Sequence, residues 1–441
     1  MIIPSDPDYE PARQVKAGGY DLRPAAIVRA RDARDVAATV AFARATGTEL
    51  AVRSGGHSGA GHSTTDGGIV IDLVEMKGLE IDPEARTAWA ETGLTAGEVT
   101  VATAEHGLAV GFGDTASVGI GGLTTGGGIG YLVRKHGMTI DSVLAAEIVT
   151  ADGEIRVVDA DHDSDLFWAI RGGGGNFGVV TRFQYRLQPV EQVVGGILVL
   201  PATAQTVEGF LAAAEAAPEE LSTIANVMNC PPLPFVPEEH HGSIVILAML
   251  CHVGDVEAGE AAMAPFRALA EPLADLVKPI SYPEMYPPEE GAGEDFRPLV
   301  VGRTFFMDHV APTDAEAIMR HLGASDAPMR ATQLRVLGGA MARVPADATA
   351  FAHRSRRILA ICVAFHSGGD DQATKDAWVE AFANDLRQGG EGAYVNFLEA
   401  EDPTAIRRAY PGATGERLAR VKAAVDPTNL FRRNHNVAPA G

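Results

Sequence analysis

The stretch Gly111–Gly130 constrains the fold more than any other part of the chain, because nine of its twenty residues are glycine. Glycine in regular structure costs roughly 0.5–1 kcal/mol relative to alanine, so a folded domain keeps such a run where the backbone must come very close to something. Flexible linkers are polar and rich in Ser and Pro, whereas this run contains Phe112, Val118, Ile120 and Leu123. The stretch therefore predicts a backbone surface for a ligand.

A second glycine-rich segment, residues 53–62, contains His57 and His62 and lies between apolar runs at 49–53 and 68–73 that predict strands. Consecutive backbone N–H groups in such a turn form a nest that binds anions. Two interpretations stay open from this segment alone. It is either a phosphate-binding loop that includes a histidine, or a glycine-rich hairpin turn with solvent-facing histidines. The histidine spacing does not match the HExxH pattern, so no metal site is predicted.

A third glycine cluster, residues 172–178, contains the pattern GxGxxG at Gly173, Gly175 and Gly178. A dinucleotide fingerprint of this kind follows a strand and opens a helix, so that the pyrophosphate lies at the helix N-terminus. Here the predicted order is reversed, with a short helix at 165–171 before the cluster and a strand at 179–187 after it. The sequence therefore argues against a Rossmann domain, and it contains no Walker A motif.

Composition limits the class of protein. A chain of 441 residues is expected to form two or three domains, and its net charge of −22 argues against nucleic acid and anionic membranes as partners. The three cysteines, Cys230, Cys251 and Cys362, form no metal-binding pattern and are typical of a reducing compartment. We identify no secretory signal at the N-terminus and no apolar run long enough to span a membrane, so we expect a cytoplasmic protein.

The order of predicted elements indicates an α+β fold. A strand at 26–28 precedes a helix that Asp32 caps and Gly47 ends, and Thr95 with Glu98 forms a capping box for a second helix. A hairpin turning at Asp152-Gly153 is expected within 143–158. The glycine clusters stop near residue 194, and beyond it strands and helices alternate around a loop at 279–299. We expect domains at 1–194 and 195–390, the second with an antiparallel sheet covered by helices, and a C-terminal segment at 391–441 that returns to the first domain.

The three glycine motifs in this order resemble the FAD domain of the vanillyl-alcohol-oxidase superfamily, the PCMH type. They read RSGGHS at 53–58, GxGGxxxGGGxG at 119–130 and GNFGVV at 175–180. The tail, with Tyr394-x-Asn396, DPxNxF at 426–431 and Asn434-x-Asn436, resembles the terminal segment of berberine-bridge-enzyme-like oxidases, with the hydroxynicotine-oxidase-like branch nearby. The resemblance covers nearly the whole chain and implies a two-part FAD domain followed by a substrate domain.

The resemblance also implies roles for individual residues. His57 would be bonded through a ring nitrogen to the 8α-methyl carbon of FAD, and Tyr394 and Asn396 would lie at the catalytic side of the flavin. The other residues expected to contact FAD are Val52, Arg53, Ser54, Gly55, Gly56, Ser58, Gly59, His62, Gly113, Asp114, Thr115, Ala116, Val118, Gly119, Gly122, Gly126, Gly127, Gly128, Gly130, Val180, Asn396, Asn434 and Asn436.

Two departures from the family pattern affect the chemistry. Relatives with a second covalent link carry a cysteine in the turn 114–117, where we match Ala116, so one link is expected. Many alcohol-oxidising relatives have a tyrosine base where this chain has Phe397, which accepts no proton. The base is therefore open between Tyr394, whose other role is a packed aromatic, and a residue of 280–365, where Tyr286, Arg303 and His309 are candidates.

The function that follows from the resemblance is an FAD-dependent oxidase. Hydride would pass from a small alcohol, sugar or amine to flavin N5, and O2 would then reoxidise the flavin and give H2O2. The alternatives are a dehydrogenase that uses another acceptor, and a flavin- or ligand-binding protein without turnover, which the missing tyrosine base would favour. The expected partners are therefore a small-molecule substrate and O2.

Overall fold

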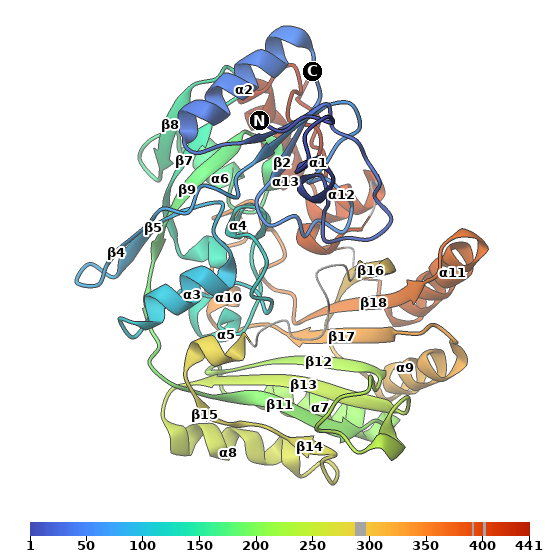
Figure 1. The fold of residues 1–441 in the computed structure, drawn as a ribbon. Coiled ribbons are helices and arrows are strands. Elements are labelled where there is room, and N and C mark those ends of the chain that lie inside the picture. The colour runs from blue at the N-terminus through green and yellow to red at the C-terminus, as the bar shows by residue number, and fades with distance from the viewer. Residues whose placement is uncertain (287–296, 390–391, 400–402) are drawn as a thin grey trace.

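The protein was analysed as a computed structural model that describes residues 1–286, 297–389, 392–399 and 403–441. Part of the loop expected at 279–299 and the domain boundary expected at 390–391 lie outside these residues. Three sheets form the framework, and the fold is α+β, as the sequence predicts (Figure 1). The short elements outside the sheets and main helices are α1 (Tyr9–Ala12), η1 (Thr139–Asp141), η2 (Gly174–Asn176), η3 (Glu238–His240), η4 (Tyr282–Met285) and the pair β6 (Leu108–Ala109) and β10 (Gln188–Pro189).

The first sheet is small and parallel, in the order β1-β3-β2. Its strands are β1 (Ala26–Arg29), β2 (Leu50–Arg53) and β3 (Ile69–Asp72), and α2 (Ala33–Thr46) connects the first two. The predicted caps of α2 are present, because the Asp32 side chain accepts hydrogen bonds from two backbone N–H groups and Gly47 adopts a left-handed φ of 68°. Since β2 and β3 run parallel, the segment between them is a crossing loop and the hairpin interpretation is wrong.

The second sheet has five antiparallel strands in the order β4-β5-β9-β7-β8. The strands are β4 (Leu79–Asp82), β5 (Thr87–Glu91), β7 (Val143–Val149), β8 (Ile155–Asp159) and β9 (Val179–Arg186), with helices α3 (Ala96–Ala104), α4 (Ile120–Gly126), α5 (Val133–His136) and α6 (Ser164–Ala169) between them. The capping box of Thr95 and Glu98 and the hairpin of β7 and β8 are confirmed. The glycine-rich stretch passes through α4, which contacts β9 of this sheet.

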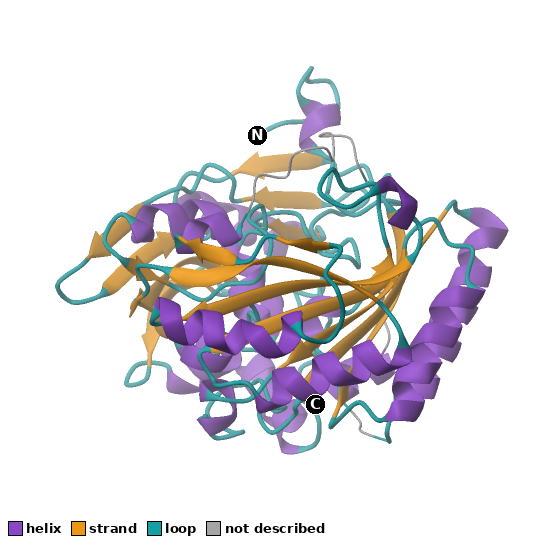
Figure 2. Cartoon of the chain, turned by 90° about the horizontal axis from the view of Figure 1, so that it is seen from below, coloured by secondary structure: helices purple, strands orange, loops and turns teal. Residues whose placement is uncertain are grey.

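The third sheet is antiparallel and has eight strands, seven of them in the order β14-β11-β13-β12-β17-β18-β16, with β15 paired to β11. They are β11 (Val193–Pro201), β12 (Leu221–Asn229), β13 (Ile244–Val253), β14 (Ala274–Asp275), β15 (Lys278–Ile280), β16 (Leu299–Met307), β17 (Arg330–Val336) and β18 (Ile358–His366). One face is covered by α7 (Ala204–Ala216), α8 (Val256–Arg267), α9 (Pro312–Ala324) and α11 (Gly369–Leu386), as Figure 2 shows from below. Phe210, Phe266, Phe305 and Phe382 are fully buried between these layers.

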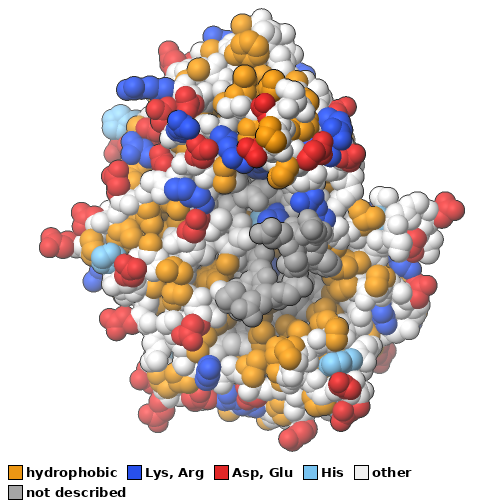
Figure 3. All heavy atoms as spheres, in the orientation of Figure 1, with side chains coloured by type: hydrophobic (Ala, Val, Ile, Leu, Met, Phe, Trp, Pro, Cys, Tyr) orange, Lys and Arg blue, Asp and Glu red, His pale blue; other side chains and the backbone are white. Residues whose placement is uncertain are grey.

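The opposite face of the eight-stranded sheet is turned towards the glycine-rich half (Figure 1). Arg134 of α5 joins the two halves, because its guanidinium donates to the carbonyl oxygens of Ala214, Ala217 and Leu221 at 2.8–3.0 Å. The short helix α10 (Ala340–Arg343), which follows β17, packs against α5 at the same place. On the face of the molecule that Figure 3 shows, charged side chains of both signs are spread over both halves, with hydrophobic side chains between them.

The C-terminal segment returns to the glycine-rich half and consists of η5 (Val395–Phe397), α12 (Pro403–Ala409) and α13 (Ala413–Val425). By its composition, Tyr394-Val395-Asn396-Phe397 would be expected to form a strand, and this expectation is wrong: the Phe397 N–H donates to Tyr394 O in a tight 3-10 turn. On α13, the fully buried Lys422 ammonium donates to Asn176 O, Asp426 Oδ2 and Phe431 O at 2.6–2.8 Å. The Lys422 ammonium therefore connects α13 to the segment 426–431 and to the third glycine cluster.

Candidate cofactor and substrate site

One cavity of about 410 Å³ brings together the motifs that the sequence singles out. Its walls come from the loop after β2, the glycine-rich stretch, the third glycine cluster and the C-terminal segment. The residues expected to contact FAD that do line it are Val52, Ser54, Gly55, Gly56, His57, Ser58, Gly59, His62, Gly113, Asp114, Thr115, Val118, Gly119, Gly122, Gly128, Val180, Tyr394, Asn396 and Asn434. Segments more than 370 residues apart in the sequence thus form one site.

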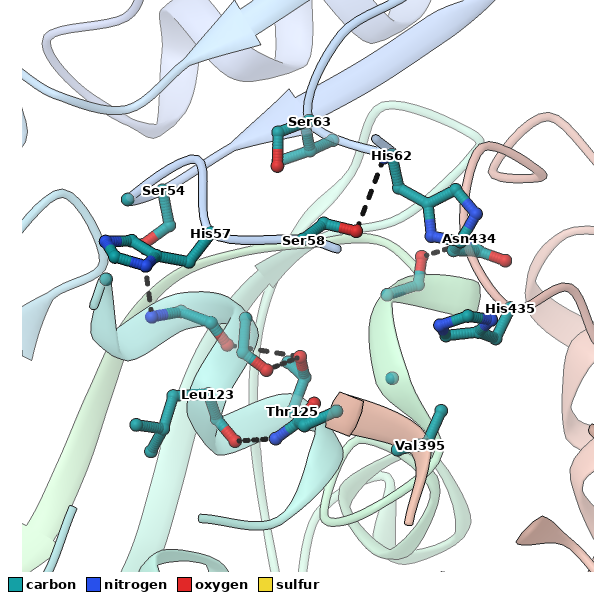
Figure 4. A pocket seen from close by; sticks show the side chains of 18 of the residues that line it. Ser54, His57, Ser58, His62, Ser63, Leu123, Thr125, Val395, Asn434 and His435 are labelled. Carbon is teal, nitrogen blue, oxygen red and sulfur yellow. Dashed lines mark hydrogen bonds between the residues drawn. The ribbon is translucent and has the colours of Figure 1, made fainter. Parts of the chain in front are cut away.

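His57 is held at one side of the cavity by a neighbour from the glycine-rich stretch. Its Nε2 lies 2.9 Å from the Oγ of Ser117, which fixes the plane of the imidazole ring. Ser58, on the same loop, accepts a hydrogen bond from the His62 N–H at 3.3 Å. Figure 4 shows His57 on one side of the pocket, with His62 and His435 on the other. The loop therefore presents its two histidines to different parts of the cavity.

Backbone meets backbone where the His57 loop touches the glycine-rich stretch. A Cβ on Gly55 would lie 2.2 Å from the Gly119 nitrogen, so a larger residue does not fit there. Ser54 ties the two segments together, because its Oγ accepts from Gly121 N at 3.2 Å and donates to Thr92 O at 2.5 Å. The result is a cavity wall made largely of main-chain atoms, which suits a diphosphate that binds to backbone N–H groups.

The far side of the cavity contains the buried His62, the half-buried His435 and an arginine. The rings of His62 and His435 meet edge to face at 4.7 Å. Burial lowers the pKa of His62 to about 3 and that of His435 to about 4, so both imidazoles are neutral at pH 7. Arg433 also lines the cavity, and its Nε donates to Thr64 O at 3.0 Å. A guanidinium is therefore present at this wall.

Tyr394 and Asn396 face the glycine-rich stretch from the C-terminal segment. The Tyr394 hydroxyl accepts hydrogen bonds from Gly128 N at 2.7 Å and Asn396 Nδ2 at 3.0 Å, and Asn396 also donates to Leu123 O at 3.0 Å. Burial raises the pKa of Tyr394 to about 12, against the opposing effect of these two hydrogen bonds. The phenol is therefore protonated at neutral pH, which is unfavourable for a general base.

A buried ion pair connects the cavity to the eight-stranded sheet. Arg335 of β17 donates from Nη2 to Asp114 Oδ2 at 2.7 Å and from Nη1 to Ile129 O at 2.8 Å. Its guanidinium also lies 5.0 Å from the centre of the Phe397 ring, at the position where alcohol-oxidising relatives would have a tyrosine. Asp114 and Phe397 line the cavity. The ion pair of Arg335 and Asp114 therefore lies between the cavity and the eight-stranded sheet.

Six of the residues expected to contact FAD do not line the cavity: Arg53, Ala116, Gly126, Gly127, Gly130 and Asn436. Arg53 is buried in an ion pair with Asp72 and donates to Ala12 O, so it anchors the N-terminal arm. Gly126, Gly127 and Gly130 lie behind the cavity wall, where the neighbouring residues leave no space for a side chain. A Cβ on Gly126, for example, would lie 1.9 Å from Asn396 Oδ1. Ala116 packs instead beside a cluster that includes Tyr131 and Tyr286.

The sequence reasoning missed several lining residues. They are Gly174, Gly175, Asn176, Gly178 and Val179 of the third glycine cluster, and Phe397, Leu398, Tyr410, Phe431, Arg433 and His435 of the C-terminal segment. The glycines of 172–178 were a signal that could have identified the first group. Of the candidate bases outside the tail, Tyr286 donates to Gly113 O at 3.0 Å and Arg303 pairs with Glu380 and Asp376 on the helix-covered face. Neither of these two lines the cavity.

The described part of the chain contains no helix that is both long and apolar enough to cross a membrane. The same residues contain no group of three or more His, Cys, Asp or Glu side chains that could hold a metal ion. All three cysteines are buried free thiols.

Comparison with known proteins identifies two domain families. Residues 24–159 match the FAD binding domain family and residues 393–438 the family described as berberine and berberine like. Along its whole length the chain is 30% identical to (R)-6-hydroxynicotine oxidase of Paenarthrobacter nicotinovorans, covering 97% of that protein. It is 27% identical to the xylooligosaccharide oxidase of Thermothelomyces thermophilus, with 95% of this chain and 88% of that protein aligned. The crystal structure of 6-hydroxy-D-nicotine oxidase from Arthrobacter nicotinovorans superposes with a TM-score of 0.87 at 28% identity, covering 100% of this chain and 97% of the other.

Proposed function

Because the chain belongs to the family of FAD-linked oxidoreductases with a berberine-bridge-like C-terminal segment, we propose that it is an oxidase with FAD bound covalently through His57. The observation that carries the proposal is the convergence of His57, the backbone wall at Gly55 and Gly119, and the C-terminal residues Tyr394 and Asn396 on one cavity. When bound there, FAD supplies the redox chemistry, accepting hydride at N5 from a small organic substrate and passing the electrons to O2 with formation of H2O2.

The residues around the cavity have separate tasks in this proposal. The contact between Ser117 Oγ and His57 Nε2 orients the imidazole ring, and a ring nitrogen of His57 would bond to the 8α carbon. The main-chain wall and Arg433 would hold the diphosphate, and the apolar side chains Val52 and Val180 would contact the adenine part. Asn396, fixed by Leu123 O and Tyr394, offers a hydrogen-bonding side chain from the C-terminal segment. Binding in this cavity would orient the flavin ring and exclude water from it.

The proposal also includes the division into domains and the location of the protein. The division into a flavin domain at 1–194, a substrate domain at 195–390 and a returning segment at 391–441 is supported by the separate sheets and cores. A cytoplasmic location is supported by the three buried free thiols. The competing function is a dehydrogenase that passes the electrons to another acceptor. Mixing the substrate-reduced protein with air separates the two: an oxidase regains its oxidised flavin spectrum at once and forms H2O2, whereas a dehydrogenase stays reduced.

We infer that a second covalent link would start at position 115 rather than at position 116, because Thr115 lines the cavity and Ala116 does not. We expect wild-type protein to carry flavin on the His57 peptide alone, Thr115→Cys to form a second bond, and Ala116→Cys to form none. Proteolysis and mass spectrometry of the flavin peptides check this. Flavin bonded to the Cys introduced at 116 would contradict the assignment.

Tyr394 is expected to support the pocket rather than to accept a proton. General bases contribute typically 10²–10⁴-fold, so Tyr394→Phe should change the anaerobic rate of flavin reduction by less than about tenfold if the phenol is not the base. The substitution leaves Gly128 N–H without its acceptor, which should cost about 1–3 kcal/mol of stability. Stopped-flow reduction with the best substrate of a panel, together with urea unfolding, measures both. A loss of a hundredfold or more with the flavin still attached would make Tyr394 the base.

A further inference from the structure

The face of the eight-stranded sheet that is turned towards the glycine-rich half contains a short polar row in an apolar surface. Residues on this face alternate along the central strands with residues of the helix-side core, so that Asn226 points one way and Ala225 and Val227 the other. Asn226 lies directly opposite Leu247 on β13 and Gln333 on β17. Because register partners share a face, these three side chains form one transverse row.

Hydrogen bonds orient the two amides of this row. Gln333 Nε2 donates to Asn226 Oδ1 at 2.8 Å, and Asn226 Nδ2 donates to Leu247 O at 3.2 Å. Gln333 Oε1 accepts from Arg335 Nε at 2.7 Å, and the same guanidinium is paired with Asp114 in the cavity wall. The row is therefore connected to the cofactor cavity through protein contacts and is fixed in one orientation.

The amides keep hydrogen-bonding capacity after these contacts. A primary amide offers two N–H donors and two acceptor positions. In the contacts among the described residues, each amide uses one donor and one acceptor position, so one of each is left for a ligand. Both side chains are partly exposed rather than buried. A single group that both donates and accepts is the natural complement of this pair.

The side chains beside the pair on this face are mainly apolar. Leu247, Met249, Ile361 and Val363 occupy alternate positions on the same face and are also partly exposed. Arg335 is committed to Asp114 and Ile129, so this cation is already balanced within the protein. A sugar chain placed here would press hydroxyl groups against Leu, Met and Ile and lose their hydrogen bonds to water. An anion would meet the Asp114 carboxylate beside the guanidinium.

From this arrangement we infer that Asn226 and Gln333 select the substrate, and that it is a neutral, mainly apolar small molecule with one hydroxyl or carboxamide group. The inference rests on the proposed flavin function, because the row is taken to face a substrate next to the flavin. Asn226 and Gln333 are specificity residues in this scheme: they position the molecule through its polar group, while Leu247, Met249, Ile361 and Val363 contact its apolar part.

The test uses the flavin-loaded protein and follows changes in the visible flavin spectrum during titration with four probes. These are benzamide and benzyl alcohol as neutral donor–acceptor molecules, benzoate as an anion and cellobiose as a carbohydrate. Benzamide and benzyl alcohol should bind at least tenfold more tightly than benzoate and cellobiose. Asn226→Leu should weaken benzamide binding about tenfold, the order of one hydrogen bond. The matched control is Gln205→Leu, an exposed glutamine on α7, which should bind as the wild type does.

Gln333→Met, which keeps the side-chain length, should have the same effect as Asn226→Leu. Since it also removes the acceptor of Arg335 Nε, its flavin content is measured first, and Asn226→Leu decides the matter if that content falls. Tighter binding of cellobiose or benzoate than of benzamide overturns the inference, as does wild-type benzamide affinity in Asn226→Leu. A wild-type protein purified without flavin would instead refute the proposed function itself.

Discussion

Replacing His57 with alanine should move nearly all of the flavin from the protein pellet to the supernatant after acid precipitation, whereas the wild-type pellet should stay yellow. The reason is that the proposed bond joins FAD to a ring nitrogen of His57. The other histidines on the cavity wall, His62 and His435, do not lie at the position of His57. His62 and His435 lie on the other side of the pocket (Figure 4). Denaturing electrophoresis with detection of flavin fluorescence gives a second reading of the same result.

The control for this experiment is His106→Ala, which removes an exposed histidine near the end of α3 and should leave the flavin on the chain. In His57→Ala the main-chain wall at Gly55 and Gly119 is unchanged, so native protein should still bind FAD reversibly and lose it on denaturation. A wild-type protein that releases all of its flavin into acid would show that the link does not exist.

Lys422→Met should lower the free energy of unfolding by about 3–5 kcal/mol, because it leaves the Asp426 carboxylate buried without its cation. The ammonium also holds Asn176 O and Phe431 O, and both acceptors lose their donor. Asn176 and Phe431 line the cavity, so the same substitution should reduce the amount of bound flavin. Urea unfolding followed by tryptophan fluorescence, with flavin absorbance recorded on the same samples, measures the two effects together.

Two further variants separate burial from charge. Lys77→Met breaks a partly exposed pair with Glu98 and should cost no more than about 1 kcal/mol. The double variant Lys422→Met with Asp426→Asn removes the uncompensated carboxylate and should recover part of the loss, since an amide oxygen can still accept from the N–H groups of Leu430 and Phe431. Equal losses in Lys422→Met and Lys77→Met would show that the buried contacts of Lys422 do not hold the segment.

Local chemistry made part of the fold and of the candidate site predictable. Asp32, Gly47 and the Thr95–Glu98 box act within a few residues of their own position, so their capping roles can be read without tertiary information. The same holds for the glycine motifs, because close backbone approach requires glycine whatever the approaching group is. The sequence therefore predicted the α+β class and the segments that form the cavity.

Long-range contacts account for what was missed. The residues Tyr394-Val395-Asn396-Phe397 favour a strand by propensity, but hydrogen bonds from Gly128 N to Tyr394 and from Asn396 to Leu123 O hold them in a turn. Thr115 lines the cavity and Ala116 does not, because the turn at 114–117 points neighbouring side chains in different directions. A family motif aligned one residue off therefore selects the wrong one of these two positions. The ion pair of Arg335 and Asp114 joins residues 221 positions apart on different elements, and no local pattern reveals it.

The return of the C-terminal segment to the His57 loop has a consequence for biosynthesis. On a ribosome, residues 52–59 and 113–130 emerge early, but the wall formed by Tyr394, Asn396 and residues 433–435 is made only near the end of translation. A nascent chain that stops before Tyr394 has only part of the pocket. Under the proposed function, the complete cofactor site would therefore exist only after almost the whole polypeptide has left the ribosome.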